Sequence, residues 1–178
     1  MSTTGGVTPD VRRSVALRTQ AYYRRVAEEA LAKAGVLNPP VPVTQLIEGM
    51  GIPVIPVNLP QFFTAATVSQ DGLPSILVNY ARPESDRQRA LAHMLGHILL
   101  LLDDPSNTFP REAADHGDAD QVAHELTMPS VMVMEQSRLW FNDYRYLARL
   151  FGVGEGEMLD RMRALGIVND QQSIRWDY

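Results

Sequence analysis

The sequence predicts an α+β fold, in which a small antiparallel sheet packs on a mainly helical domain that ends in a helical C-terminal part. Three observations support this class: an apolar stripe at helical spacing near the N-terminus, alternating β-branched residues after it, and helical periodicity from about residue 84 onward. A length of 178 residues suits one compact domain. We expect residues 1–10 to be a flexible lead and residues 11–178 to form that single domain.

The first elements are predicted to be helical. Apolar residues at helical spacing predict a helix over about 11–34, which Gly35 ends. A run of prolines then breaks the chain, and Thr44 is expected to cap a short helix that ends at Met50.

Strands are predicted next. Alternating apolar residues over 52–57 indicate one strand, and the β-prone runs 64–69 and 75–79 indicate two more. An Asp-Gly pair lies between the last two runs, which is typical of a hairpin. One edge of this sheet, near 64–69, could accept an extended peptide by strand addition.

The second half is predicted to be helical. After Pro83 the pattern is helical as far as Leu102, with acidic residues in the first turn, where the helix dipole favours anions. A second helix is expected from somewhere near Pro110 to Thr127, where Pro129 follows. Two further helices, at about 131–151 and 155–165, complete the fold.

Composition excludes several classes of function. The net charge of −5 argues against a protein that mainly neutralises phosphates, so we expect no nucleic-acid partner. The chain has no cysteine, which leaves histidine and carboxylate as metal ligands. It also shows no signal-peptide core and no apolar stretch of membrane-spanning length, so we expect a cytoplasmic protein with no membrane partner.

Two histidines at helical spacing form the candidate site. His93 and His97 stand at i and i+4, so both imidazoles can reach one ion from the same helix face. A zinc site needs a third ligand, and His116 is the candidate, whereas His124 is expected at the surface. The spacing also fits a purely structural alternative, in which the two histidines lie at the edge of the core and form hydrogen bonds with backbone groups.

Three stretches together resemble the ImmA/IrrE family of zinc metallopeptidases. Residues 87–100 read RQRALAHMLGHILL, which is similar to the family signature RxRFTLAHELGHxLL. Residues 119–129 look like its second block, ANxFAAELLMP, and the stretch from Leu147 to Gly166 looks like its closing block. The resemblance spans about 45–168. It implies a zincin-like metallopeptidase domain, and some members of the family cleave helix-turn-helix repressors.

The resemblance also implies roles for particular residues. His93 and His97 match the two metal-binding histidines, and His116 stands where the family has a glutamate ligand. Asp120 matches a position whose side chain can hydrogen-bond a metal ligand and hold it in place. We therefore expect one divalent ion, zinc, as the cofactor. Met94 stands where the family has its catalytic glutamate, so the catalytic residue is unknown.

The loss of that glutamate determines the functional expectation. In such enzymes it takes a proton from metal-bound water, and losing a general acid–base group costs about 10²–10⁴ in rate. Asp118 and Glu125 are nearby carboxylates, but we expect both on a solvated helix face. The leading interpretation is a pseudo-peptidase that binds a protein or peptide in regulation, such as a helix-turn-helix repressor. The alternative is an active zinc-dependent hydrolase or lyase with altered chemistry at a tri-histidine site.

Two other features favour packing over function. Leu147 to Leu165 could be read as a DNA-binding helix-turn-helix, but its arginines are balanced by carboxylates, so packing is the better interpretation. The aromatic residues outside the motif could line a peptide groove, but we expect most of them in the core or at its edge. These are Phe62, Phe63, Trp140, Phe141, Tyr144 and Tyr146.

Overall fold

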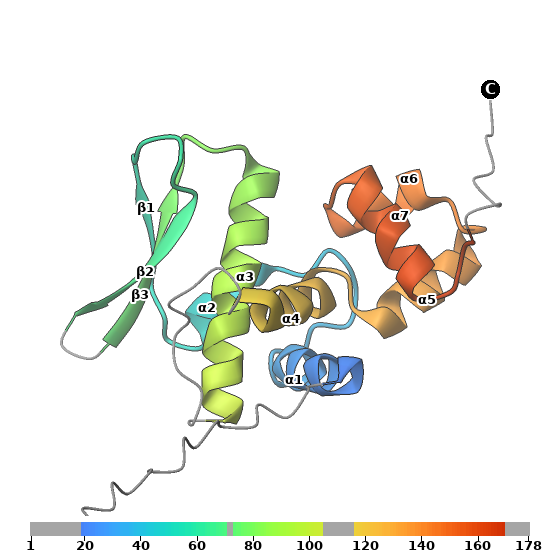
Figure 1. Cartoon of the computed structure of the whole chain (residues 1–178), viewed down its shortest axis with the longest axis horizontal. Helices are drawn as coiled ribbons and strands as arrows, with labels where there is room; N and C mark the ends of the chain where they lie inside the picture. The colour runs from blue at the N-terminus through green and yellow to red at the C-terminus, as the bar shows by residue number, and fades with distance from the viewer. Residues whose placement is uncertain (1–18, 71–72, 105–115, 170–178) are drawn as a thin grey trace, which may run out of the picture.

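A computed structural model describes residues 19–70, 73–104 and 116–169, and it confirms the α+β class (Figure 1). The elements in chain order are α1 (Gln20–Lys33), α2 (Val43–Gly49), β1 (Val54–Val57), β2 (Ala65–Gln70), β3 (Leu73–Asn79), α3 (Glu84–Asp103), α4 (Gly117–Thr127), α5 (Ser130–Leu139), α6 (Tyr144–Phe151) and α7 (Glu155–Ala164). The expected flexible lead 1–10, the start of the first helix, the Asp-Gly turn and the region around Pro110 lie outside the described residues.

The sheet is mixed, which corrects the expectation of a purely antiparallel one. Its strand order is β1-β3-β2. The hairpin of β2 and β3 is antiparallel, as predicted, but β1 pairs with β3 in parallel. The chain reverses after β1 and again after β2, so β3 runs in the direction of β1 and lies between the other two strands. Both β1 and β2 are therefore edge strands.

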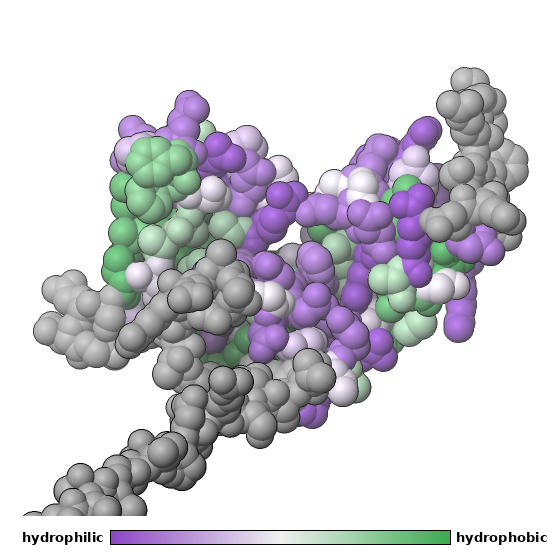
Figure 2. Space-filling view, in the orientation of Figure 1, coloured by the Kyte–Doolittle hydropathy of each residue, from purple (hydrophilic) through white to green (hydrophobic). Residues whose placement is uncertain are grey.

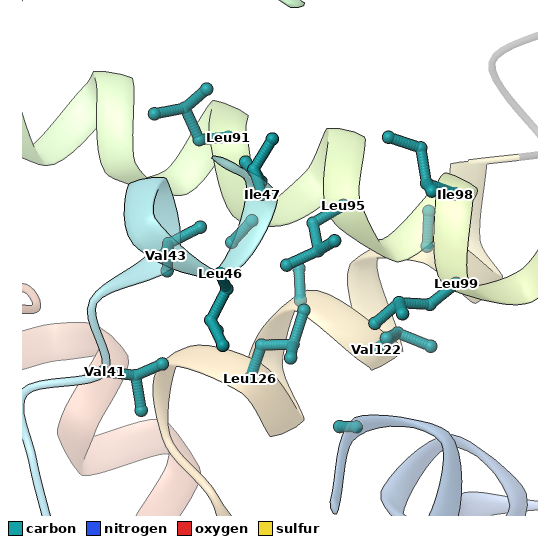
Figure 3. Close-up of a cluster of buried hydrophobic side chains, with 14 of the residues drawn as sticks. Val41, Val43, Leu46, Ile47, Leu91, Leu95, Ile98, Leu99, Val122 and Leu126 are labelled. Carbon is teal, nitrogen blue, oxygen red and sulfur yellow. The ribbon is translucent and has the colours of Figure 1, made fainter. Parts of the chain in front are cut away.

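The helix α3 is the centre of the larger core. It begins after Pro83 with acidic residues in its first turn, as predicted, and the sheet lies along one side of it (Figure 1). Helices α2 and α4 cover another side, where Leu46, Leu95 and Leu126 pack together (Figure 3). Burial of these leucines stabilises the fold by about 1.5–3 kcal/mol for each side chain.

Two predicted helix boundaries were wrong. Thr44 does not cap α2, because the helix begins at Val43 with Pro42 in the cap position. The helix expected over 131–151 is divided at Phe141 and Asn142, whose backbone φ angles are 53° and 61°. Such left-handed residues end α5, and the carboxylate of Asp143 then accepts hydrogen bonds from two backbone N–H groups at the start of α6.

The helices α5, α6 and α7 form a second, smaller apolar cluster. Leu147, Phe151, Met158 and Met162 are its central residues. A buried ion pair joins this cluster to α4, since Arg161 Nη2 lies 2.7 Å from Glu125 Oε2. Arg161 also donates to the Met128 carbonyl and to the Ser130 hydroxyl. The polar groups of this junction therefore satisfy one another.

The expectation that most of the aromatic residues outside the motif lie in the core or at its edge was wrong. Phe62 is 80% exposed and Phe141 is 90% exposed, and Phe63 and Trp140 are also exposed. Tyr144, which packs against the second cluster, follows the expectation. Within the described residues, no helix has the length and apolar character needed to cross a membrane.

Candidate metal centre

Two helices bring three histidines to one point. His93 and His97 lie one turn apart on α3, and His116 lies immediately before α4. His93 Nε2 is 2.8 Å from His116 Nδ1 and 3.0 Å from His97 Nε2, and the last two nitrogens are 3.1 Å apart. The structure thus brings together all three of the predicted ligands, each with one ring nitrogen in a compact triangle.

A glycine allows the two helices to approach this closely. A Cβ atom at Gly96 would lie 2.6 Å from the carbonyl oxygen of Ala119, and real Cβ contacts are almost never so short. Ala119 lies in the first turn of α4, between His116 and Asp120. The absence of a side chain at Gly96 therefore allows His116 and Asp120 to lie beside the histidines of α3.

Asp120 orients His93. Its Oδ1 lies 2.6 Å from His93 Nδ1, which is the nitrogen that points away from the triangle. A carboxylate accepts a hydrogen bond here but cannot donate one, so it favours the tautomer with the proton on Nδ1 and a lone pair on Nε2. That lone pair points at the other two histidines, as a metal ligand requires.

His97 is kept neutral by its surroundings. It is buried, and burial, followed by the nearby His93 and His116, lowers its pKa to about 4. At neutral pH its imidazole is therefore uncharged, so a second proton does not compete with a metal ion.

The donor set fits a divalent transition metal. Nitrogens bound to tetrahedral zinc lie about 2.0–2.1 Å from the ion, which places them roughly 3.4 Å apart. The spacings of 2.8 to 3.1 Å are close to this value, so a small outward movement of the rings would admit the ion. Three imidazoles suit zinc and also copper, iron and nickel, and they leave a fourth position open.

Met94 contacts the sheet. The Thr67 hydroxyl of β2 donates a hydrogen bond to Met94 Sδ over 3.2 Å, and the rest of the side chain packs on the main core. Position 94 is thus between the histidine pair and the edge strand. A thioether there has no group that can take up or release a proton.

Three other candidates are placed apart from the triangle. His124 is exposed on α4, as expected. Glu125 was expected on a solvated face, but it is only 2% exposed and is paired with Arg161. Asp118 is half-buried and accepts a hydrogen bond from the Tyr23 hydroxyl, so its expected solvation was also wrong. Glu125 lies one turn after Val122 and next to Leu126. This position borders the apolar stripe of α4, and it is the sequence feature that could have predicted the burial of Glu125.

The sequence match decides the family. Residues 47–163, well over half of the chain, match the peptidase family described as the IrrE N-terminal-like domain. The chain belongs to this family. The IrrE-like region includes α3, α4 and most of α7, so it contains every residue of the triangle and the ion pair of Arg161.

A solved structure has a fold similar to that of this chain. A Mycobacterium tuberculosis transcriptional regulator is similar to this chain with a TM-score of 0.60 and 21% sequence identity. The match covers 79% of this chain and 46% of the regulator, so the chain spans about half the length of that protein. This likeness concerns the fold. No curated protein matches the sequence significantly.

Proposed function

We propose that this chain is a metal-binding, IrrE-like pseudo-peptidase that acts in regulation by binding a protein or peptide. The observation that carries the proposal is the combination of a complete histidine triangle with a methionine at the position of the catalytic glutamate. The first feature favours metal binding, whereas the second removes the group that would move protons during peptide hydrolysis.

His93, His97 and His116 would hold the ion, with Asp120 behind His93. We propose zinc, because three neutral nitrogen ligands and an open position suit it. A bound zinc ion supplies Lewis acidity, and the residues of the chain hold and orient it. Without the glutamate, that acidity would be available to a carbonyl or carboxylate of a bound partner.

The edge strand β2 supports a binding role. Its Thr67 contacts Met94, one residue from His93, so a peptide added to this edge would run beside the histidine triangle. Backbone hydrogen bonds would provide affinity without cleavage. The proposed partner is a helix-turn-helix repressor or a peptide from one, in the cytoplasm, and the name of the similar mycobacterial regulator is in keeping with a regulatory role.

Metal titration and a protease assay test this function together. The wild-type protein should bind about one equivalent of zinc and should not cleave casein or a co-encoded repressor above the level seen with chelator. His116→Ala should lose most of the zinc affinity, whereas the matched control His124→Ala should keep it, because His124 is exposed and outside the triangle. Equal zinc binding by both variants would disprove the three-ligand assignment, and chelator-sensitive cleavage by the wild type would disprove the loss of activity.

A second function is favoured by the ligand set itself. Three neutral imidazoles would leave a divalent ion with its full charge, so such a site would acidify water more strongly than one with a carboxylate ligand. An active hydrolase or lyase with altered chemistry is therefore the alternative. Turnover of simple esters that depends on zinc and is lost in His116→Ala would favour it over pure binding.

A further inference from the structure

The outer face of the sheet is apolar, and Ile55 and Val68 on it are exposed. Ile55 of β1 and Ala66 of β2 both pair with Leu77 of β3, so these three side chains form one row across the sheet. Their chain neighbours Ile76 and Thr67 face the core and α3, and side chains alternate along a strand, so the row points away from α3. Figure 2 shows hydrophobic side chains gathered over the strands.

Two phenylalanines extend this face at one end. The rings of Phe62 and Phe63 lie 4.7 Å apart on the connection between β1 and β2, and both are exposed. Asn79, which is fully buried, holds this connection in place, because its side-chain amide donates to the carbonyls of Leu59 and Phe63 and its Oδ1 accepts from Leu59 N–H. The backbone that presents the phenylalanines is thus fixed.

The same region is nearly free of charge. From Gly51 to Tyr80 the sequence contains a single charged residue, Asp71, although 21% of the whole chain is charged. Two copies of a chain with a net charge of −5 repel each other over most of their surfaces. An uncharged face can be apposed to itself without that cost, whereas an anionic bilayer would repel this chain. The guanidinium of Arg82 contacts the Gln61 carbonyl beside this face, but it is paired with Asp86.

We propose that this outer face is the interface of a homodimer, in which two copies pack sheet against sheet about a twofold axis. A twofold contact uses the same patch on both copies, and sheets that pack face to face lie about 10 Å apart with interdigitating β-branched side chains. The interface consists of Ile55, Phe62, Phe63, Val68 and Leu77. The edge of β2 and the histidine triangle are on other sides of the strands, so dimerisation leaves them accessible.

Sedimentation equilibrium of the full chain, from about 1 to 200 μM, tests the interface. The wild type should dimerise, and Ile55→Glu and Val68→Glu should each weaken the dimer at least tenfold, because they bury a carboxylate against apolar surface. Ile55 and Val68 are 40% and 38% exposed, so the monomer should stay folded, which circular dichroism checks. The matched control is Val131→Glu on the exposed side of α5, which should dimerise like the wild type.

A cross-linking experiment locates the contact independently. The chain has no cysteine, so Val68→Cys and Val131→Cys each introduce a single thiol. Under mild oxidation, Val68→Cys should form covalent dimers at least tenfold faster than Val131→Cys. A wild type that stays monomeric at about 200 μM would overturn the proposal. So would dimers that survive both glutamate substitutions, equal cross-linking of the two thiols, or a monomer that instead binds neutral lipid vesicles.

Discussion

Gly96 of α3 lies against the backbone of Ala119 in α4, and a Cβ atom at position 96 would be 2.6 Å from the Ala119 carbonyl oxygen. We therefore expect Gly96→Ala to lower the free energy of unfolding by about 1–3 kcal/mol, the usual cost of overpacking. It should also weaken zinc binding, because α4 must move and carries His116 and Asp120 with it. Urea denaturation and zinc titration measure the two effects.

Gly156→Ala is the matched control for this substitution. Gly156 also lies within a helix, α7, but a Cβ atom there meets nothing within 4 Å. Alanine is the better helix former by about 1 kcal/mol, so this variant should be as stable as the wild type or more so, with unchanged zinc affinity. If both glycine variants behaved alike, the close approach at Gly96 would have no energetic meaning.

Asp120→Asn should weaken zinc binding by about 10–100-fold while the protein stays folded. The carboxylate hydrogen-bonds His93 Nδ1 at 2.6 Å, and a neutral amide would orient that ring less strongly and make it less basic. Isothermal titration with zinc measures the change. Asp160→Asn, which removes a highly exposed carboxylate on α7, should bind zinc as the wild type does. An unchanged affinity in Asp120→Asn would mean that His93 needs no such support.

Met94→Glu should introduce some zinc-dependent cleavage of casein. The Thr67 hydroxyl that donates to the Met94 sulfur can donate to a carboxylate instead, and the new group would lie beside the histidine triangle. Met94→Glu with His116→Glu should be more active still, because it rebuilds the ligand set that the family resemblance implies. Cleavage is compared with and without chelator. Two folded, zinc-binding variants with no activity above the wild type would show that more than the glutamate has been lost.

Arg161→Met should cost about 3–5 kcal/mol of stability, because it leaves the carboxylate of Glu125 buried without its partner. The control is Arg163→Met, two residues along the same helix, whose ion pair with Asp160 is at the surface and is worth at most about 1 kcal/mol. Urea denaturation compares the two variants. A similar small loss in both would contradict the structural importance of the buried pair.

Asp103 should make stability depend on pH in the acid range. Burial raises its pKa, but hydrogen bonds from Tyr22 and Arg25 outweigh burial and hold the pKa below the usual 3.8. A carboxylate with a lowered pKa stabilises the fold above its unfolded pKa and loses this effect as the pH falls. The stability difference between the wild type and Asp103→Asn should therefore be largest above about pH 5 and shrink toward pH 3. A difference that is constant with pH would exclude this ion pair as the cause.

Local patterns predicted the features that depend on neighbouring residues. The limits of α3 followed from Pro83 and helical periodicity, and the histidine pair followed from its spacing. Tertiary contacts could not be predicted in this way. The residues next to Glu125 in the sequence do not indicate that Arg161 is its partner. The closeness of Gly96 to Ala119 depends on how two helices cross.

The exposed phenylalanines escaped prediction for a related reason. Hydrophobicity indicates that a side chain avoids water, but not which surface covers it. Phe62 is 80% exposed, so the described part of the chain leaves most of this side chain uncovered. The parallel pairing of β1 with β3 was likewise hidden, because strand order depends on the path of the connections and not on the strands themselves.

The separation of the apolar side chains into two clusters has a consequence for how the chain opens. Helices α5, α6 and α7 share one cluster, while α1 to α4 and the sheet share the other, and Glu125 and Arg161 bridge them. Contiguous elements with their own cluster tend to unfold locally as one cooperative unit. Opening of the C-terminal unit would break the bridge yet leave α3 and α4 paired, so amide hydrogens around His93 should exchange only in rarer, larger openings than those of α7.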